Sequence, residues 1–222
     1  MVWIVRRKTL NRKIVVIKRK GKKRSKRLLI FDDQSVFGIS EDVFVSTGLE
    51  VGSEIDEKYL LELESKENDH QAFHAAISLL NYRMRSKAEL KKRLSEKGYE
   101  SGAIDNVIQK LEEKKFINDE LFAQAFINDK IHSRLLGPIA LRRELIPHRL
   151  DSELVEKLLQ QAYKETPEEE LVERLMTKRN IRPGEKISPR DRNRLLAYLQ
   201  RRGHRWDVIK IVFDNWLLVA GE

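Results

Sequence analysis

An internal repeat in the longer, C-terminal part of the chain constrains the fold more than any other feature of the sequence. Three segments align on Leu94, Leu145 and Leu199, which stand 51 and 54 residues apart. A leucine precedes each of these anchors by four residues, and apolar residues follow at 10, 13 and 14 residues. This pattern predicts two helices in each segment, with a turn four residues after the anchor. The turn positions are Gly98, Arg149 and Gly203.

A further helix is predicted ahead of each pair, at Gln71–Met84, Asp119–Arg134 and Pro167–Lys178. Asn118 or Asp119 can cap the second, and Pro167 followed by three glutamates favours the start of the third. The helical part therefore consists of three tandem three-helix repeats. Because each repeat has little apolar surface of its own, it needs its neighbours for stability. We expect an elongated, curved array.

The N-terminal segment is predicted to be β-structure. Short β-branched or aromatic runs at residues 2–5, 13–18, 27–31 and 35–39 are typical of strands, and the period becomes helical from Asp56 onward. The fold class is thus mostly α with a small β-rich N-terminal domain. The predicted domains are a basic β-rich domain at 1–55, a first repeat with a lead-in helix at 56–118, a second repeat at 119–165 and a third at 166–222.

The net charge of +9 is concentrated at the N-terminus. Residues 1–31 contain thirteen lysines and arginines and no acidic residue, so the remainder carries −4. A basic segment of this kind predicts a polyanionic partner, and nucleic acid is favoured over a membrane because no apolar face accompanies the charge. The alternative is a hairpin that lysines merely keep solvated.

Several classes of protein are excluded by composition. The chain has no cysteine, which excludes a disulfide scaffold, a thiolate metal site and a cysteine nucleophile. No apolar run is long enough to cross a membrane, so we expect a cytoplasmic protein without a membrane partner. His70 and His74 have a spacing compatible with a metal, but no third ligand of suitable spacing accompanies them. We therefore predict no catalytic residue, metal or cofactor, and no enzyme activity.

Four stretches together resemble the RecX family, over roughly residues 72–216. They are NYRMRSKAELKKRLSEKGY at 81–99, VIQKLEEKKFINDELFAQAF at 107–126, RLLGPIALRREL at 134–145 and LLAYLQRRGHRWDVIKIVF at 195–213. In the second stretch, Asp119, Phe122 and Ala123 match the family pattern D-x-x-F-A. The chain departs from the family pattern at four positions: Arg149 replaces a glycine, Pro147 before it should end its helix early, His204 replaces an aromatic residue, and Lys115 stands where the family often has a glycine.

The resemblance implies a regulator that binds the filament of the RecA recombinase and lowers its ATPase and strand-exchange activities in DNA recombination and repair. The sequence does not decide whether the protein blocks filament growth, speeds filament disassembly or stabilises the filament. The expected partners are the RecA filament and single-stranded DNA, with double-stranded DNA as a further candidate, and we expect a monomer. The alternative function is general nucleic-acid binding through the basic hairpin and the helical repeats, without a recombinase.

Basic residues on the hairpin and the repeats are the candidate contacts for DNA or recombinase. Each could instead belong to the solvated face of its helix, which is the usual place of charged runs. For Trp206, packing within its own repeat is favoured over stacking on a base. The candidates are Lys18, Arg19, Lys20, Lys22, Lys23, Arg24, Lys26, Arg83, Arg85, Lys91, Lys92, Arg134, Arg142, Arg143, Arg201, Arg202 and Arg205.

Overall fold

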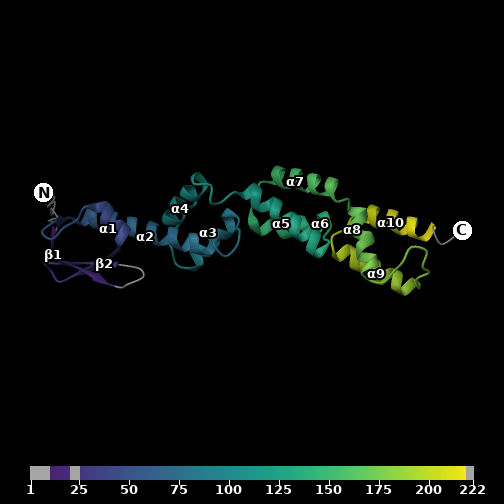
Figure 1. The fold of residues 1–222 in the computed structure, drawn as a ribbon, viewed down its shortest axis with the longest axis horizontal. Coiled ribbons are helices and arrows are strands. Elements are labelled where there is room, and N and C mark those ends of the chain that lie inside the picture. Colours follow the sequence, from purple (N-terminus) through teal and green to yellow (C-terminus); the bar gives the residue numbers. More distant parts are fainter. Residues whose placement is uncertain (1–10, 21–25, 219–222) are drawn as a thin grey trace, which may run out of the picture. The chain divides into compact units, whose positions relative to one another are not determined.

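The fold is described here for residues 11–20 and 26–218 of a computed structural model (Figure 1). Its contacts divide the chain into two compact units, Met1–Arg83 with Lys91–Glu113, and Met84–Leu90 with Lys114–Glu222. The predicted fold class is confirmed, since a small N-terminal sheet precedes a chain that is otherwise mostly helical. Within the described ranges, no helix has both the length and the apolar character that a membrane crossing requires.

The sheet of the first unit has four antiparallel strands in the order β3-β2-β1-β4. They are β1 (Arg12–Lys20), β2 (Lys26–Phe31), β3 (Val36–Ser40) and β4 (Glu54–Ile55). One apolar cluster buries Ile14, Leu29, Phe31 and Ile39 of the sheet. Leu63, on the helix that follows β4, belongs to the same cluster. The first three of these strands confirm three predicted runs, whereas the run at residues 2–5 lies outside the described residues.

A short helix that the sequence analysis did not predict lies between β3 and β4. Helix α1 (Glu41–Thr47) begins at Ser40, whose hydroxyl accepts a hydrogen bond from the Val43 N–H, and ends at Gly48 with φ 62°. Its β-branched and aromatic residues resemble those of a strand. The capping residues and the packing of Val43 into the apolar cluster decide the conformation instead.

The first repeat contains α2 (Glu57–Leu80), α3 (Lys87–Glu96) and α4 (Ser101–Glu113). Helix α2 corrects the predicted bounds 71–84, because it begins at the Asp56 cap, runs through the lead-in segment and ends before Asn81. Helices α2 and α4 pack together. Helix α4 buries apolar residues at the predicted offsets, namely Ile104, Val107 and Ile108.

The second and third repeats share one apolar core within the second unit. The anchor leucines Leu145 and Leu199 are buried in it, as the repeat pattern predicts. The elements are α5 (Asp119–Arg134), α6 (Pro138–Leu145), the 3-10 helix η1 (Ile146–His148), α7 (Ser152–Glu165), α8 (Glu168–Thr177), α9 (Pro189–Arg201) and α10 (Trp206–Leu218).

The turn position of each repeat has the same backbone conformation. Gly98, Arg149 and Gly203 have φ values of 87°, 50° and 80°, all in the left-handed region. Arg149 therefore adopts a conformation that costs a non-glycine residue about 1–2 kcal/mol. The early helix end predicted from Pro147 is also confirmed, since α6 stops at Leu145 and continues as η1.

Candidate polyanion-binding site

The second and third repeats approach each other through two glycines. The Gly137 N–H donates to the Arg202 carbonyl at 2.9 Å, and the Ile139 N–H donates to the Gly203 carbonyl at 3.1 Å. A Cβ on Gly137 would lie 2.3 Å from the Gly203 oxygen, and a Cβ on Gly203 would lie 2.2 Å from the Ala140 nitrogen. Only glycine allows this backbone contact, which brings α6 next to the end of α9.

Side chains fix the same junction by binding the carbonyls at the end of α5. Arg202 Nη1 donates to the Arg134 carbonyl at 2.6 Å, and His204 Nε2 lies 3.0 Å from the Leu135 carbonyl. The Tyr163 hydroxyl donates to the Leu136 carbonyl at 2.7 Å. Burial and the nearby Glu168 carboxylate raise the pKa of Tyr163 above its ordinary value, so the phenol stays a donor.

A hollow of about 350 Å³ opens at this junction. Four arginines and one glutamate line it, a formal net charge of +3. Arg134 is partly neutralised by Glu144 at 2.7 Å, and the Arg202 guanidinium lies 5.3 Å from the Tyr198 ring centroid. The lining residues are Arg134, Leu136, Ala140, Arg143, Glu144, Tyr198, Arg201 and Arg202.

Two of the four arginines are available for a ligand. Arg143 and Arg201 are exposed, and neither forms a hydrogen bond or an ion pair with any residue that the structure describes. A guanidinium binds phosphate or carboxylate oxygens through two parallel N–H donors. Two guanidinium groups already lie over the Tyr198 ring, that of Arg202 and that of Arg179, which is 4.0 Å from the ring centroid. The hollow therefore suits anionic groups better than stacked bases.

Three other sequence-predicted contacts are held by carboxylates within the chain. Arg142 binds Glu156 through two hydrogen bonds of 2.5 and 2.7 Å. Lys91 lies 2.6 Å from Asp105, and Arg205 lies 2.8 Å from Glu168. A polyanion would have to compete with these internal partners.

The remaining predicted contacts lie on the sheet and the first repeat. Lys92 is exposed, with Glu96 only at 4.0 Å, and Arg83 is exposed in the turn before α3. The hairpin residues Lys18, Arg19, Lys20 and Lys26 are exposed on β1 and β2. Lys22, Lys23 and Arg24 lie outside the described residues.

Two sequence-based interpretations are corrected. Arg85 is only 9% exposed and pairs with Glu89, so it is not a surface contact. It is buried because the neighbouring segment packs within the second unit, where the Lys87 N–H donates to Asp119 at 2.8 Å. Trp206 does not pack fully within its repeat, because it begins α10 and remains 53% exposed.

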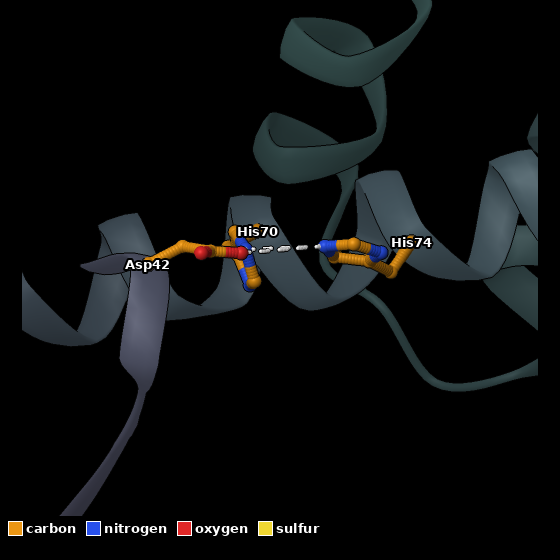
Figure 2. A group of neighbouring side chains, drawn as sticks. All are labelled: Asp42, His70 and His74. Atoms are coloured by element: carbon orange, nitrogen blue, oxygen red, sulfur yellow. Dashed lines mark hydrogen bonds and ion pairs between the residues drawn. The ribbon is translucent and has the colours of Figure 1, made fainter. Parts of the chain in front are cut away.

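Sequence analysis identified His70 and His74 as a possible metal pair but missed a third possible ligand in the first unit, Asp42. Asp42 lies next to His70 and His74, with the His70 Nε2 to Asp42 Oδ2 distance at 3.0 Å (Figure 2). Asp42 is 28 residues from His70 and lies on the helix that was not predicted. No local spacing in the sequence could have identified it.

The similarity of the chain to known proteins matches this architecture. Residues 72–111 match the family described as RecX, first three-helix domain, and residues 118–159 match RecX, second three-helix domain. The Regulatory protein RecX of Bacillus velezensis is 32% identical over 197 residues, which cover 87% of this chain and 74% of that protein. The chain belongs to the RecX family. The RecX of Bacillus subtilis is 30% identical over 196 residues, with the same coverage.

Two solved RecX structures share the fold. One, described as the crystal structure of regulatory protein RecX, has a TM-score of 0.70 at 22% identity and covers 91% of this chain and 99% of its own. RecX from Lactobacillus salivarius has a TM-score of 0.58 at 21% identity and covers 69% of this chain and 99% of its own. The RecX relatives are named as regulatory proteins rather than as enzymes.

The RecX-like motifs of the sequence have structural roles here. In D-x-x-F-A, the Asp119 carboxylate accepts the Lys87 N–H, the Phe122 ring packs 4.7 Å from that of His148, and Ala123 is fully buried. The glycine–proline start of α6 and the R-R-G turn after α9 supply Gly137 and Gly203, the two glycines that dock the repeats. These motifs build the junction, and its arginines define the candidate site.

Proposed function

We propose that this RecX chain binds the filament of a RecA-type recombinase, including its DNA, and lowers the filament's ATPase and strand-exchange activities. The observation that carries the proposal is the basic hollow, in which Arg143 and Arg201 are exposed and have no hydrogen-bond or ion-pair partner among the described residues. Family membership supports the regulatory role. Phosphates of the DNA and acidic side chains of the filament both carry negative charge, which complements the positive charge of the hollow.

A second attachment is proposed on the hairpin. The strand register places Lys20 opposite Lys26 and Arg19 opposite Arg27. Arg27 is compensated by Glu41 at 2.6 Å, but Lys20 and Lys26 are both exposed. Like charges directly opposite each other destabilise a strand pair, and a bound polyanion relieves that repulsion. Two weak attachments on one chain give a higher effective affinity than either alone.

The hollow is tested by reversing its two available charges. In the double variant Arg143→Glu, Arg201→Glu, the protein concentration needed for half-inhibition of recombinase ATPase on single-stranded DNA should rise by about 10-fold or more. The reason is that each charge-assisted hydrogen bond contributes about 1.5–3 kcal/mol. Arg190→Glu with Arg192→Glu is the matched control, since both residues are exposed on α9 outside the hollow. The proposed function would be overturned if the unmodified chain left the recombinase ATPase unchanged. Equal losses in the two double variants would overturn the role of the hollow.

The hairpin is tested on DNA without recombinase. Lys20→Glu with Lys26→Glu keeps like charges opposite each other, so the fold should change little, while two phosphate contacts are lost. The slope of log affinity against log salt for single-stranded DNA should become shallower by about 1.4, from about 0.7 for each phosphate. Lys58→Glu with Lys66→Glu, two exposed lysines on α2, should leave the slope unchanged.

An unchanged slope in the hairpin variant would count against the hairpin contact. The general nucleic-acid-binding function would be favoured instead if bare DNA were bound tightly and recombinase added nothing to the binding.

A further inference from the structure

Three metal-ligating side chains converge in the first unit, away from the basic hollow. The His70 Nε2 atom lies 3.0 Å from Asp42 Oδ2 and 3.2 Å from His74 Nε2, and the third distance, from His74 Nε2 to Asp42 Oδ2, is 3.9 Å. Figure 2 shows the carboxylate and the two rings directed toward one another, with Asp42 from α1 and the histidines one turn apart on α2.

Hydrogen bonding alone does not account for this arrangement. His70 Nε2 carries at most one hydrogen, which cannot point at both the Asp42 oxygen and the His74 nitrogen. If both rings carry a hydrogen at Nε2, two donors face each other. If neither does, lone pairs of nitrogen and oxygen face each other. If only one ring does, one of the two short contacts of His70 Nε2 is a hydrogen bond and the other has no hydrogen. A cation placed among the three atoms satisfies all of them together.

We propose that Asp42, His70 and His74 form a site for a divalent transition-metal ion, with zinc as the best-matched ion. Two ligands bound to tetrahedral zinc at about 2.0–2.1 Å lie about 3.3–3.4 Å apart, and the three separations observed bracket this value. Two imidazoles and a carboxylate form a donor set that zinc accepts, whereas calcium and magnesium require mostly oxygen ligands.

The surroundings assign Asp42 as the carboxylate ligand. Glu41 is engaged by Arg27 at 2.6 Å, and Glu67 accepts hydrogen bonds from the Ser40 N–H and hydroxyl, both at 2.8 Å. All of these carboxylates line the same hollow of about 660 Å³. The Asp42 side chain is 76% exposed, so a fourth coordination position is open to water. The ion would join α1 to α2, two helices that the chain brings together from positions 28 residues apart.

The test uses the full-length chain, stripped of metal and titrated with zinc. We expect one zinc ion per chain, a rise in the thermal midpoint with zinc, and visible absorption of tetrahedral Co²⁺ on substitution with cobalt. Asp42→Asn, His70→Ala and His74→Ala should each weaken zinc binding by about 10-fold or more, as removal of even outer-shell partners commonly does. The controls His132→Ala and Asp214→Asn alter exposed residues outside the cluster and should bind as the unmodified chain does.

Asp42→Asn is the decisive variant, because it distinguishes a three-ligand site from a histidine pair acting alone. Unchanged zinc affinity in this variant would overturn the proposal, and so would the absence of stoichiometric zinc in the unmodified chain. An equal loss in the two control variants would do the same. The cobalt spectrum of the unmodified chain tests the coordination even if a variant fails to fold. The proposal does not depend on recombinase binding.

Discussion

Gly203→Ala is expected to lower the free energy of unfolding by about 2–5 kcal/mol. The left-handed backbone contributes about 1–2 kcal/mol of this loss, because φ is 80° at this position. The remainder, about 1–3 kcal/mol, comes from overpacking, since the added Cβ would lie 2.2 Å from the Ala140 nitrogen. Neither backbone can move away without breaking the hydrogen bond between the Ile139 N–H and the Gly203 carbonyl. Urea unfolding followed by circular dichroism measures the loss.

Gly98→Ala is the matched control for this prediction. Gly98 occupies the equivalent turn of the first repeat with φ 87°, and a Cβ there would meet nothing within 4 Å. The loss of unfolding free energy in Gly98→Ala should therefore be limited to the backbone cost of about 1–2 kcal/mol. The hollow should also lose affinity for polyanions in Gly203→Ala, because α6 and α9 both line it. Equal destabilisation by the two substitutions would contradict the role of glycine docking.

Glu168→Gln is expected to destabilise the second unit by about 1–3 kcal/mol, the usual cost when a buried hydrogen-bonding group loses its partner. Glu168 is 3% exposed at the start of α8. Its carboxylate accepts from the Arg205 N–H at 2.6 Å and from Arg205 Nε at 2.8 Å, and it lies 3.3 Å from His204 Nδ1. Removing the charge leaves the two Arg205 donors with a weaker acceptor.

The same carboxylate makes stability depend on pH. Burial by itself would raise the pKa of Glu168, but the nearby His204 ring and the hydrogen bonds from the backbone and side chain of Arg205 outweigh burial and lower the pKa below its ordinary value of 4.5. The folded state therefore gains stability that is complete above pH 4.5 and is lost as pH falls through the lowered pKa.

Unfolding free energies measured from pH 7 down to pH 3 test this linkage. In Glu168→Gln the part of the acid-dependent loss of stability that Glu168 contributes should be absent. Glu170→Gln is the control, because this residue is exposed on the same helix and lies 3.9 Å from Arg174. A Glu168→Gln chain as stable as the control, or one that keeps the same acid-dependent loss, would show that the buried Glu168 carboxylate contributes little.

The repeat architecture was predictable because its signals are local. Helical periodicity, caps and turn residues act within about one or two turns, so the leucine anchors predicted the buried faces and the turns at Gly98, Arg149 and Gly203. Helix α5 has the bounds that were predicted, 119–134. The same locality explains the failure at α1, where β-branched residues are typical of a strand and only capping and packing favour a helix.

The sequence predicted individual residues of the candidate site but not that they lie together in the fold. Four of the arginines proposed from the sequence, Arg134, Arg143, Arg201 and Arg202, line one hollow, whereas Arg85 is buried. A helical pattern shows that a residue faces away from its own core but not which carboxylate or backbone it meets. Contacts between residues 68 or 69 positions apart, such as Arg202 with the Arg134 carbonyl and His204 with that of Leu135, decide that.

The sequence alone thus determined the repeats, their buried faces and the basic character of the N-terminal segment, since each depends on residues close together in the chain. The tertiary structure alone decided which cations are neutralised within the chain and which remain available. It also decided that Asp42 meets His70 and His74. The physical reason is that charge pairing and ligand convergence depend on distances across the fold, which the docking of backbones at Gly137 and Gly203 and the capping of α1 set.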